Sequence, residues 1–148
     1  TINQMIYMRN AIETKVIIDA VDFLDEAFVA SLEYNLKRQE LLLKGDFSPE
    51  EFYEIDGAFH KTWFEKTKKC AVWDQIQKSQ VHYTRFRMLD IVVVKNFYAI
   101  YEEHKNLVEL IKNKQIDEIE AYMTRHLNGG AIRLGDKIFN EFADYFIE

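Results

Sequence analysis

Apolar residues recur every three to four positions along almost the whole chain, and this spacing restricts the fold more than any other feature. Such a period places apolar side chains on one face of an α-helix, whereas a half-buried β-strand requires alternation. Only one proline and five glycines interrupt the 148 residues. The sequence therefore predicts a single all-α domain of six to seven helices over residues 1–148.

The helix predicted to begin after Ser48 has the clearest start. Ser48 supplies a capping hydroxyl, Pro49 occupies the first helical position, and Glu50 and Glu51 place negative charge in the first turn. In the first helix we expect one buried face, made of Met5, Met8, Ile12, Val16 and Ala20. The other predicted helices cover residues 5–21, 24–43, 72–93, 95–114 and 116–127, with a last one that ends at Phe146.

Charge and cysteine content exclude several classes of protein. The net charge of −6 argues against a chain that binds nucleic acid by itself, because phosphate contacts need clustered Lys and Arg. The single Cys70 excludes an internal disulfide and fits a reducing compartment. The longest unbroken apolar run, residues 91–94, is too short to cross a bilayer. We expect a cytoplasmic protein without a membrane partner.

Four residues on three predicted helices have the chemistry of one metal site. Asp56 and His60 are four residues apart, which sets a carboxylate and an imidazole side by side on one helical face. His104 and His126 follow on later helices and could each bring one more nitrogen to the same point. Alternatively, Asp56 and His60 make an ordinary helix-surface contact, and each histidine is a hydrogen-bonded core residue.

The ordered set of IDGAFH, EEHKNLVELI and AYMTRHL resembles the FCD domain, the ligand-sensing C-terminal domain of the FadR branch of GntR-type transcription regulators. The resemblance covers nearly the whole chain. MRNAIET resembles the family's first helix, where an Arg is followed four residues later by a Glu, and TRFRML resembles its DRxRxL stretch. The chain departs from the family at Lys68-Lys69-Cys70, which replaces a small-Gly-Asn turn, and at Gln115, where an acidic cap is usual.

The resemblance implies an antiparallel helical bundle in which Asp56, His60, His104 and His126 hold a divalent metal. It also implies a homodimer that regulates transcription, with DNA bound only through a winged helix-turn-helix domain that these residues do not include. The chain would then be a sensor and not an enzyme.

Three imidazoles and one carboxylate suit Zn, Ni, Mn or Fe, and they leave coordination positions open. A small carboxylate effector fits such a position, because the metal takes one oxygen and a guanidinium can bind the carboxylate in a forked contact. Arg85 and Arg87 are the candidate anchors, and His82 and Tyr83 beside them are candidate effector-binding residues. The alternative for this stretch is a solvated basic helix face.

Two other functions remain open from the residues. One is a metal-dependent hydrolase on a helical bundle, in which the cation activates water and a carboxylate acts as general base. Glu102 and Glu103 adjoin His104, but successive helix positions point about 100° apart, so the sequence does not show that either reaches a metal. The other is a closed, purely structural metal site. No Ser-His-Asp order, CxxC pair or glycine-rich phosphate loop supports other catalysis.

Overall fold

The computed structural model describes residues 2–79, 85 and 96–127, and every structural statement below concerns those residues. They contain helices and no strand, which confirms the all-α prediction. None of these helices is long and apolar enough to span a membrane. The helices are α1 (Ile2–Asp22), α2 (Glu26–Leu43), α3 (Pro49–Lys66), α4 (Cys70–Ser79) and α6 (Phe97–Lys112), followed by a helix over residues 116–127.

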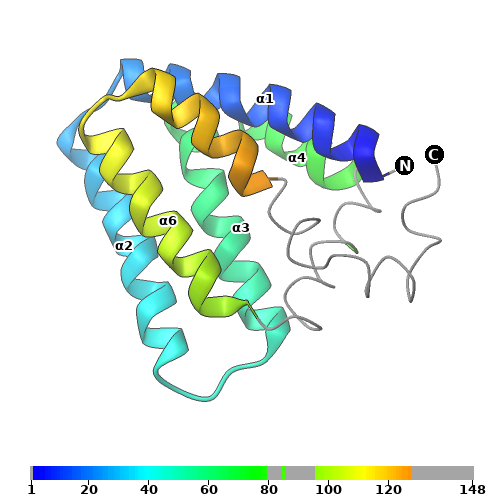
Figure 1. The fold of residues 1–148 in the computed structure, drawn as a ribbon, viewed down its shortest axis with the longest axis vertical. Helices are drawn as coiled ribbons and strands as arrows, with labels where there is room; N and C mark the ends of the chain where they lie inside the picture. Colours follow the sequence, from blue (N-terminus) through cyan, green and yellow to red (C-terminus); the bar gives the residue numbers. More distant parts are fainter. Residues whose placement is uncertain (1, 80–84, 86–95, 128–148) are drawn as a thin grey trace.

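The helices form an antiparallel bundle (Figure 1). α2 runs in the opposite direction to α3 and α6, which lie beside it, and α1 crosses one end of this group together with the 116–127 helix. Contact between those last two helices includes a hydrogen bond from Asn10 Nδ2 to Thr124 Oγ1 of 3.4 Å. The segments that carry the four candidate metal ligands thus meet inside one bundle.

The start of α3 has the predicted geometry. Ser48 Oγ accepts a hydrogen bond from the Glu51 backbone N–H at 3.2 Å, and the Glu51 side chain accepts one from the Ser48 N–H at 3.1 Å. This reciprocal capping box satisfies two N–H groups at the helix start. It fixes where α3 begins, and both Asp56 and His60 then lie on its buried face.

Two helix ends contain a lysine in a conformation that favours glycine. Lys68 follows α3 with φ of 59°, and Lys114 follows α6 with φ of 53°. In the first turn the Lys69 N–H donates to Phe64 O at 2.7 Å, and in the second the Gln115 N–H donates to Leu110 O at 3.1 Å. These are Schellman motifs, in which glycine usually takes the left-handed position. Lys68 and Lys114 therefore occupy positions that glycine usually takes.

The core is built around aromatic and aliphatic side chains of α3, and Phe59, Trp63 and Phe64 have no exposed surface. On α1 the predicted face is partly wrong. Met8 is 37% exposed, while Arg9 and Glu13 are buried. The hydrophobic pattern missed this rotation because it assigns charged residues to solvent, and here the two charged side chains bind each other at 2.6 Å inside the protein.

α1 begins three residues before its predicted start at Met5, and the other helix predictions agree with the structure to within two residues where they can be compared. The 116–127 helix has its predicted range, and α6 lies within the predicted 95–114. α4 begins at Cys70, which is exposed, two residues before the predicted start. In the second half of the helix predicted over 72–93, residue 85 is helical and the other residues from 80 to 93 lie outside the described residues. The last predicted helix also lies outside them.

Candidate metal centre

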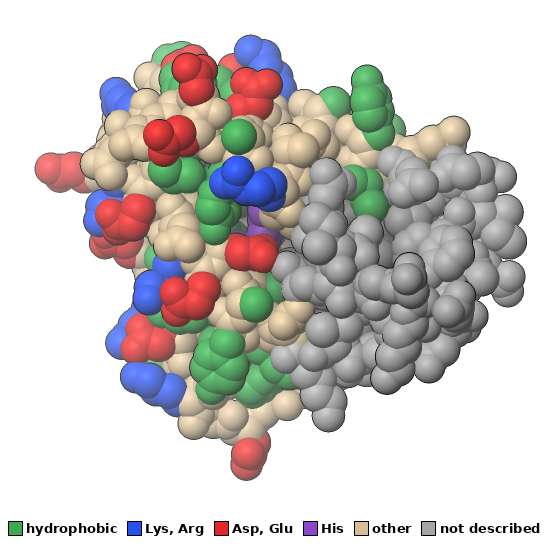
Figure 2. Space-filling view, viewed as in Figure 1, with side chains coloured by type: hydrophobic (Ala, Val, Ile, Leu, Met, Phe, Trp, Pro, Cys, Tyr) green, Lys and Arg blue, Asp and Glu red, His purple; other side chains and the backbone are tan. Residues whose placement is uncertain are grey.

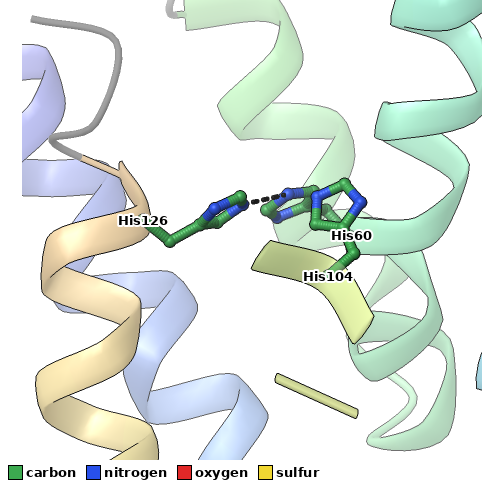
Figure 3. A group of neighbouring side chains, drawn as sticks. All are labelled: His60, His104 and His126. Atoms are coloured by element: carbon green, nitrogen blue, oxygen red, sulfur yellow. Dashed lines mark hydrogen bonds between the residues drawn. The ribbon is translucent and has the colours of Figure 1, made fainter. Parts of the chain in front are cut away.

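The bundle brings all four predicted ligands together. α3 supplies Asp56 and His60, α6 supplies His104, and the 116–127 helix supplies His126. Each of the four is no more than 5% exposed. Figure 3 shows the three imidazole rings pointing toward one another from their separate helices. The spacing of Asp56 and His60 on one helical face therefore gives the predicted side-by-side arrangement.

The inward-facing atoms lie within a few ångströms of one another. His60 Nε2 is 3.1 Å from His126 Nε2, in rings that stack with an interplanar angle of 10°. Asp56 Oδ1 lies 3.3 Å from His104 Nε2 and 3.8 Å from His60 Nε2. One nitrogen from each histidine lies within 4.8 Å of the other two. Three imidazole nitrogens thus cluster together, and Asp56 Oδ1 approaches two of them.

The other ring nitrogen of each histidine contacts an oxygen on a different residue. His60 Nδ1 contacts Glu13 Oε1, which comes from α1. His104 Nδ1 lies 2.7 Å from Gln39 Oε1, and His126 Nδ1 lies 2.5 Å from Glu103 Oε2. Carboxylate and amide oxygens only accept hydrogen bonds, so each Nδ1 is the donor. In the neutral rings, each Nε2 then presents a lone pair to the centre.

Glu13 is held at both of its oxygens. Its second oxygen accepts a hydrogen bond from Arg9 Nε at 2.6 Å, and both side chains are buried. Complete burial alone would raise the pKa of Glu13, but the electrostatic attraction and hydrogen bonds of His60 and Arg9 outweigh it and lower this pKa to about 2. Glu13 is therefore a carboxylate at neutral pH.

His104 is the most enclosed of the three histidines. Its ring stacks on Phe59 at 4.2 Å, and it has no exposed surface. Burial lowers the pKa of His104 to about 3, although the nearby Asp56 carboxylate opposes this shift. Despite the 3.3 Å approach of Asp56, Nε2 of His104 has no hydrogen bond of good geometry. Metal coordination requires a neutral imidazole with a nitrogen that is free of other hydrogen bonds, and the buried His104 ring meets both conditions.

A pocket opens onto one side of this centre. Asp56, His60 and His126 line it, and it extends to Arg9, Tyr53 and Gln77. Figure 2 shows a histidine side chain, in purple, at the bottom of an opening between acidic and basic side chains on the surface. Among the described residues, the centre is therefore open on one side.

The four candidate effector residues are described only in part. Arg85 is helical and exposed, whereas His82, Tyr83 and Arg87 lie outside the described residues. Glu13, Gln39 and Glu103 also belong to the site, although none of them was predicted from the sequence. One sequence feature could have indicated Glu13, namely the Arg-x3-Glu pattern of the first helix. No sequence feature indicated the contacts of Gln39 and Glu103, because each of these residues contacts a histidine on another helix.

Residues 4–129 of this helical bundle match the FCD domain family. The chain belongs to the FCD domain family, which is regulatory and not enzymatic. It is 25% identical over 144 residues to the HTH-type transcriptional repressor RspR of Escherichia coli K12. The uncharacterized HTH-type transcriptional regulator YdfH of Shigella flexneri is equally similar. These matches cover 96% of this chain but only 61% of each relative.

Proposed function

We propose that residues 1–148 form the metal- and effector-binding regulatory domain of a bacterial transcription regulator. The observation that carries this proposal is the orientation of the three histidines. Each Nδ1 is bonded outward, so the three Nε2 atoms face one another, and Asp56 Oδ1 lies beside two of them. Oxygen acceptors on the outer nitrogen of an imidazole are typical of metal-ligating histidines.

The residues present fit a divalent cation. Asp56, His60, His104 and His126 would hold it, and the donor set suits Zn, Ni, Mn or Fe. Asp56, Glu13 and Glu103 supply three negative charges near the centre, and Arg9 supplies one positive charge. A dication balances the resulting charge of −2, which favours it over a monovalent ion.

The pocket beside the centre supports an open coordination position rather than a closed structural site. A bound cation would offer that position to one oxygen of a ligand. We propose a small carboxylate as the effector, with Arg85 or Arg87 as its second anchor and His82 and Tyr83 beside them. The relatives are longer HTH-type regulators, so we propose that the complete regulator also has an N-terminal winged helix-turn-helix domain that binds DNA. We further propose that this regulator is a cytoplasmic homodimer.

The hydrolase alternative receives less support from the structure. A hydrolytic metal site needs a general base that faces the metal-bound water. Of the two carboxylates next to His104, Glu103 contacts His126 Nδ1 on the outer side of that ring, and Glu102 is exposed and pairs with Lys105. Neither is directed at the centre, which agrees with the regulatory character of the family.

Metal analysis of gently purified protein tests the ligand set. We expect about one divalent metal per chain, and Asp56→Ala and His104→Ala should lose it. Both should also lower the melting temperature of metal-loaded protein, because a metal that binds only the folded state stabilises it. His82→Ala is the control and should keep full metal content. Unchanged metal in both ligand variants would refute the assignment.

Thermal shift with hydroxy acids and sugar acids tests the effector class. A carboxylate that coordinates the cation must stabilise metal-loaded protein more than metal-free protein, since the two binding events are linked. Arg85→Ala or Arg87→Ala should reduce this stabilisation without removing metal. Equal stabilisation of both forms would exclude coordination. Sedimentation at micromolar concentration tests whether this chain dimerises.

A further inference from the structure

Glu13 is a fully buried carboxylate on α1 that is not among the proposed metal ligands. One oxygen contacts His60 Nδ1 and the other accepts from Arg9 Nε at 2.6 Å. The carboxylate is therefore fixed at both ends and cannot rotate without breaking a buried contact. Its position determines where the N–H of His60 can point.

Arg9 is itself held from a second direction. Its guanidinium lies 5.1 Å from the centre of the Trp73 ring, in a cation–π contact that joins α1 to α4. Arg9 also lines the pocket beside the metal centre. Trp73, Arg9 and Glu13 thus form a continuous chain of contacts that ends on His60, and it connects three helices.

Glu13 differs from the other two residues that bind an outer nitrogen. Gln39, which faces His104, is neutral, and the side chain of Glu103, which faces His126, is 26% exposed. Glu13 has no exposure. A charged acceptor in a water-free environment makes the strongest hydrogen bonds, because little solvent screens it. Among these three residues, Glu13 should therefore have the largest effect on its histidine.

We propose that Glu13 is a positioning residue that locks His60 in the Nδ1–H tautomer with Nε2 toward the metal, and that Arg9 holds Glu13 in place. This inference rests on the proposed metal function. If Glu13 positions His60, metal affinity depends on α1, a helix that supplies none of the proposed metal ligands. Metal occupancy and the placement of α1 are then linked, because a change in either alters the same chain of contacts.

Competition titration of Zn²⁺ against a chelator tests the effect on affinity. We expect Glu13→Ala to raise the Zn²⁺ dissociation constant about 10- to 100-fold, as loss of a ligand's outer hydrogen bond does in other metal sites. Glu13→Gln should have a smaller effect, since an amide oxygen can still accept from His60. Asp19→Asn is the matched control on α1, because Asp19 pairs with the exposed Lys15 in a 3.1 Å contact. The Zn²⁺ dissociation constant of this variant should equal that of the wild type.

Two measurements separate positioning from a merely structural role. A structural role would lower the melting temperature of metal-free Glu13→Ala and Glu13→Gln and leave their Zn²⁺ affinity at the wild-type value, and this result would overturn the inference. If Glu13→Ala does not fold, the Zn²⁺ affinity and melting temperature of Glu13→Gln alone decide between the two roles. Nitrogen NMR of the imidazoles in metal-free protein reports the tautomer directly, and we expect His60 to change from Nδ1–H in wild type to a mixture in Glu13→Gln.

The two proposals can fail separately. One metal per wild-type chain together with unchanged affinity and tautomer in both Glu13 variants would keep the metal site and reject the positioning role. Wild-type protein that binds no metal would reject the metal site, and the tautomer of His60 in Glu13→Gln would still decide whether Glu13 orients that ring.

Discussion

His60 Nε2 and His126 Nε2 lie 3.1 Å apart across two nearly parallel rings. Each ring donates its Nδ1–H to a glutamate, Glu13 for His60 and Glu103 for His126. In two neutral rings the facing Nε2 atoms would both present lone pairs, and such atoms repel at this distance. A proton or a cation near both nitrogens removes the repulsion. The glutamates therefore create a centre that needs positive charge.

Glu103 and Glu102 offer a matched pair of variants on α6. Glu103→Ala removes the acceptor of His126 Nδ1–H and should weaken metal binding about 10-fold or more, as the loss of outer-shell partners typically does. Glu102→Ala removes an exposed carboxylate that pairs with Lys105 and should leave metal affinity unchanged. Isothermal titration with Zn²⁺ compares them. Equal affinities would show that Glu103 does not support His126 as a ligand.

Acid should destabilise the metal-free protein in a window set by His104. Burial holds the pKa of His104 at about 3, against its usual 6.5, so between these values the unfolded chain carries a proton that the folded chain lacks. Stability then rises with pH through this window and is lost as pH falls. Glu13, with a pKa of about 2 against 4.5, adds a loss of the same sign below pH 4.5.

Urea unfolding with a chelator present measures this effect. The unfolding midpoint should be lower at pH 5 than at pH 7, and His104→Gln should reduce the difference because it removes one titrating group. A midpoint that does not change between the two pH values would contradict the neutral, buried state of His104.

The sequence predicted what depends on spacing within one helix and missed what depends on contacts between helices. Asp56 and His60 share a face because four residues make about one turn, and Ser48 marks the start of their helix. Gln39 is buried on α2, and its role as acceptor for His104 depends on how α2 packs on α6. The burial of Arg9 and Glu13 was not predicted, because a buried ion pair cannot be recognised from hydrophobic periodicity.

Lys68 and Lys114 should each be replaceable by glycine with a gain in stability. A left-handed conformation costs a non-glycine residue about 1–2 kcal/mol, and glycine's greater freedom in the unfolded chain cancels about 0.5–1 kcal/mol of that gain. We therefore expect Lys68→Gly and Lys114→Gly to raise the free energy of unfolding by roughly 0.5–1 kcal/mol each. Urea denaturation measures it, and Lys68→Ala, which keeps a Cβ, should show no gain.

The 148-residue chain by itself should not form a sequence-specific complex with DNA. Its net charge of −6 repels phosphates, and α3 and α6 use their apolar faces for the core rather than for a groove. The proposed regulator would bind DNA through its N-terminal domain. Gel-shift titration at about 0.15 M salt, where the Debye length is about 8 Å, keeps long-range attraction from imitating specific binding. A longer form with the N-terminal domain is the positive control. A specific shift by this chain alone would contradict the proposal that only the N-terminal domain binds DNA.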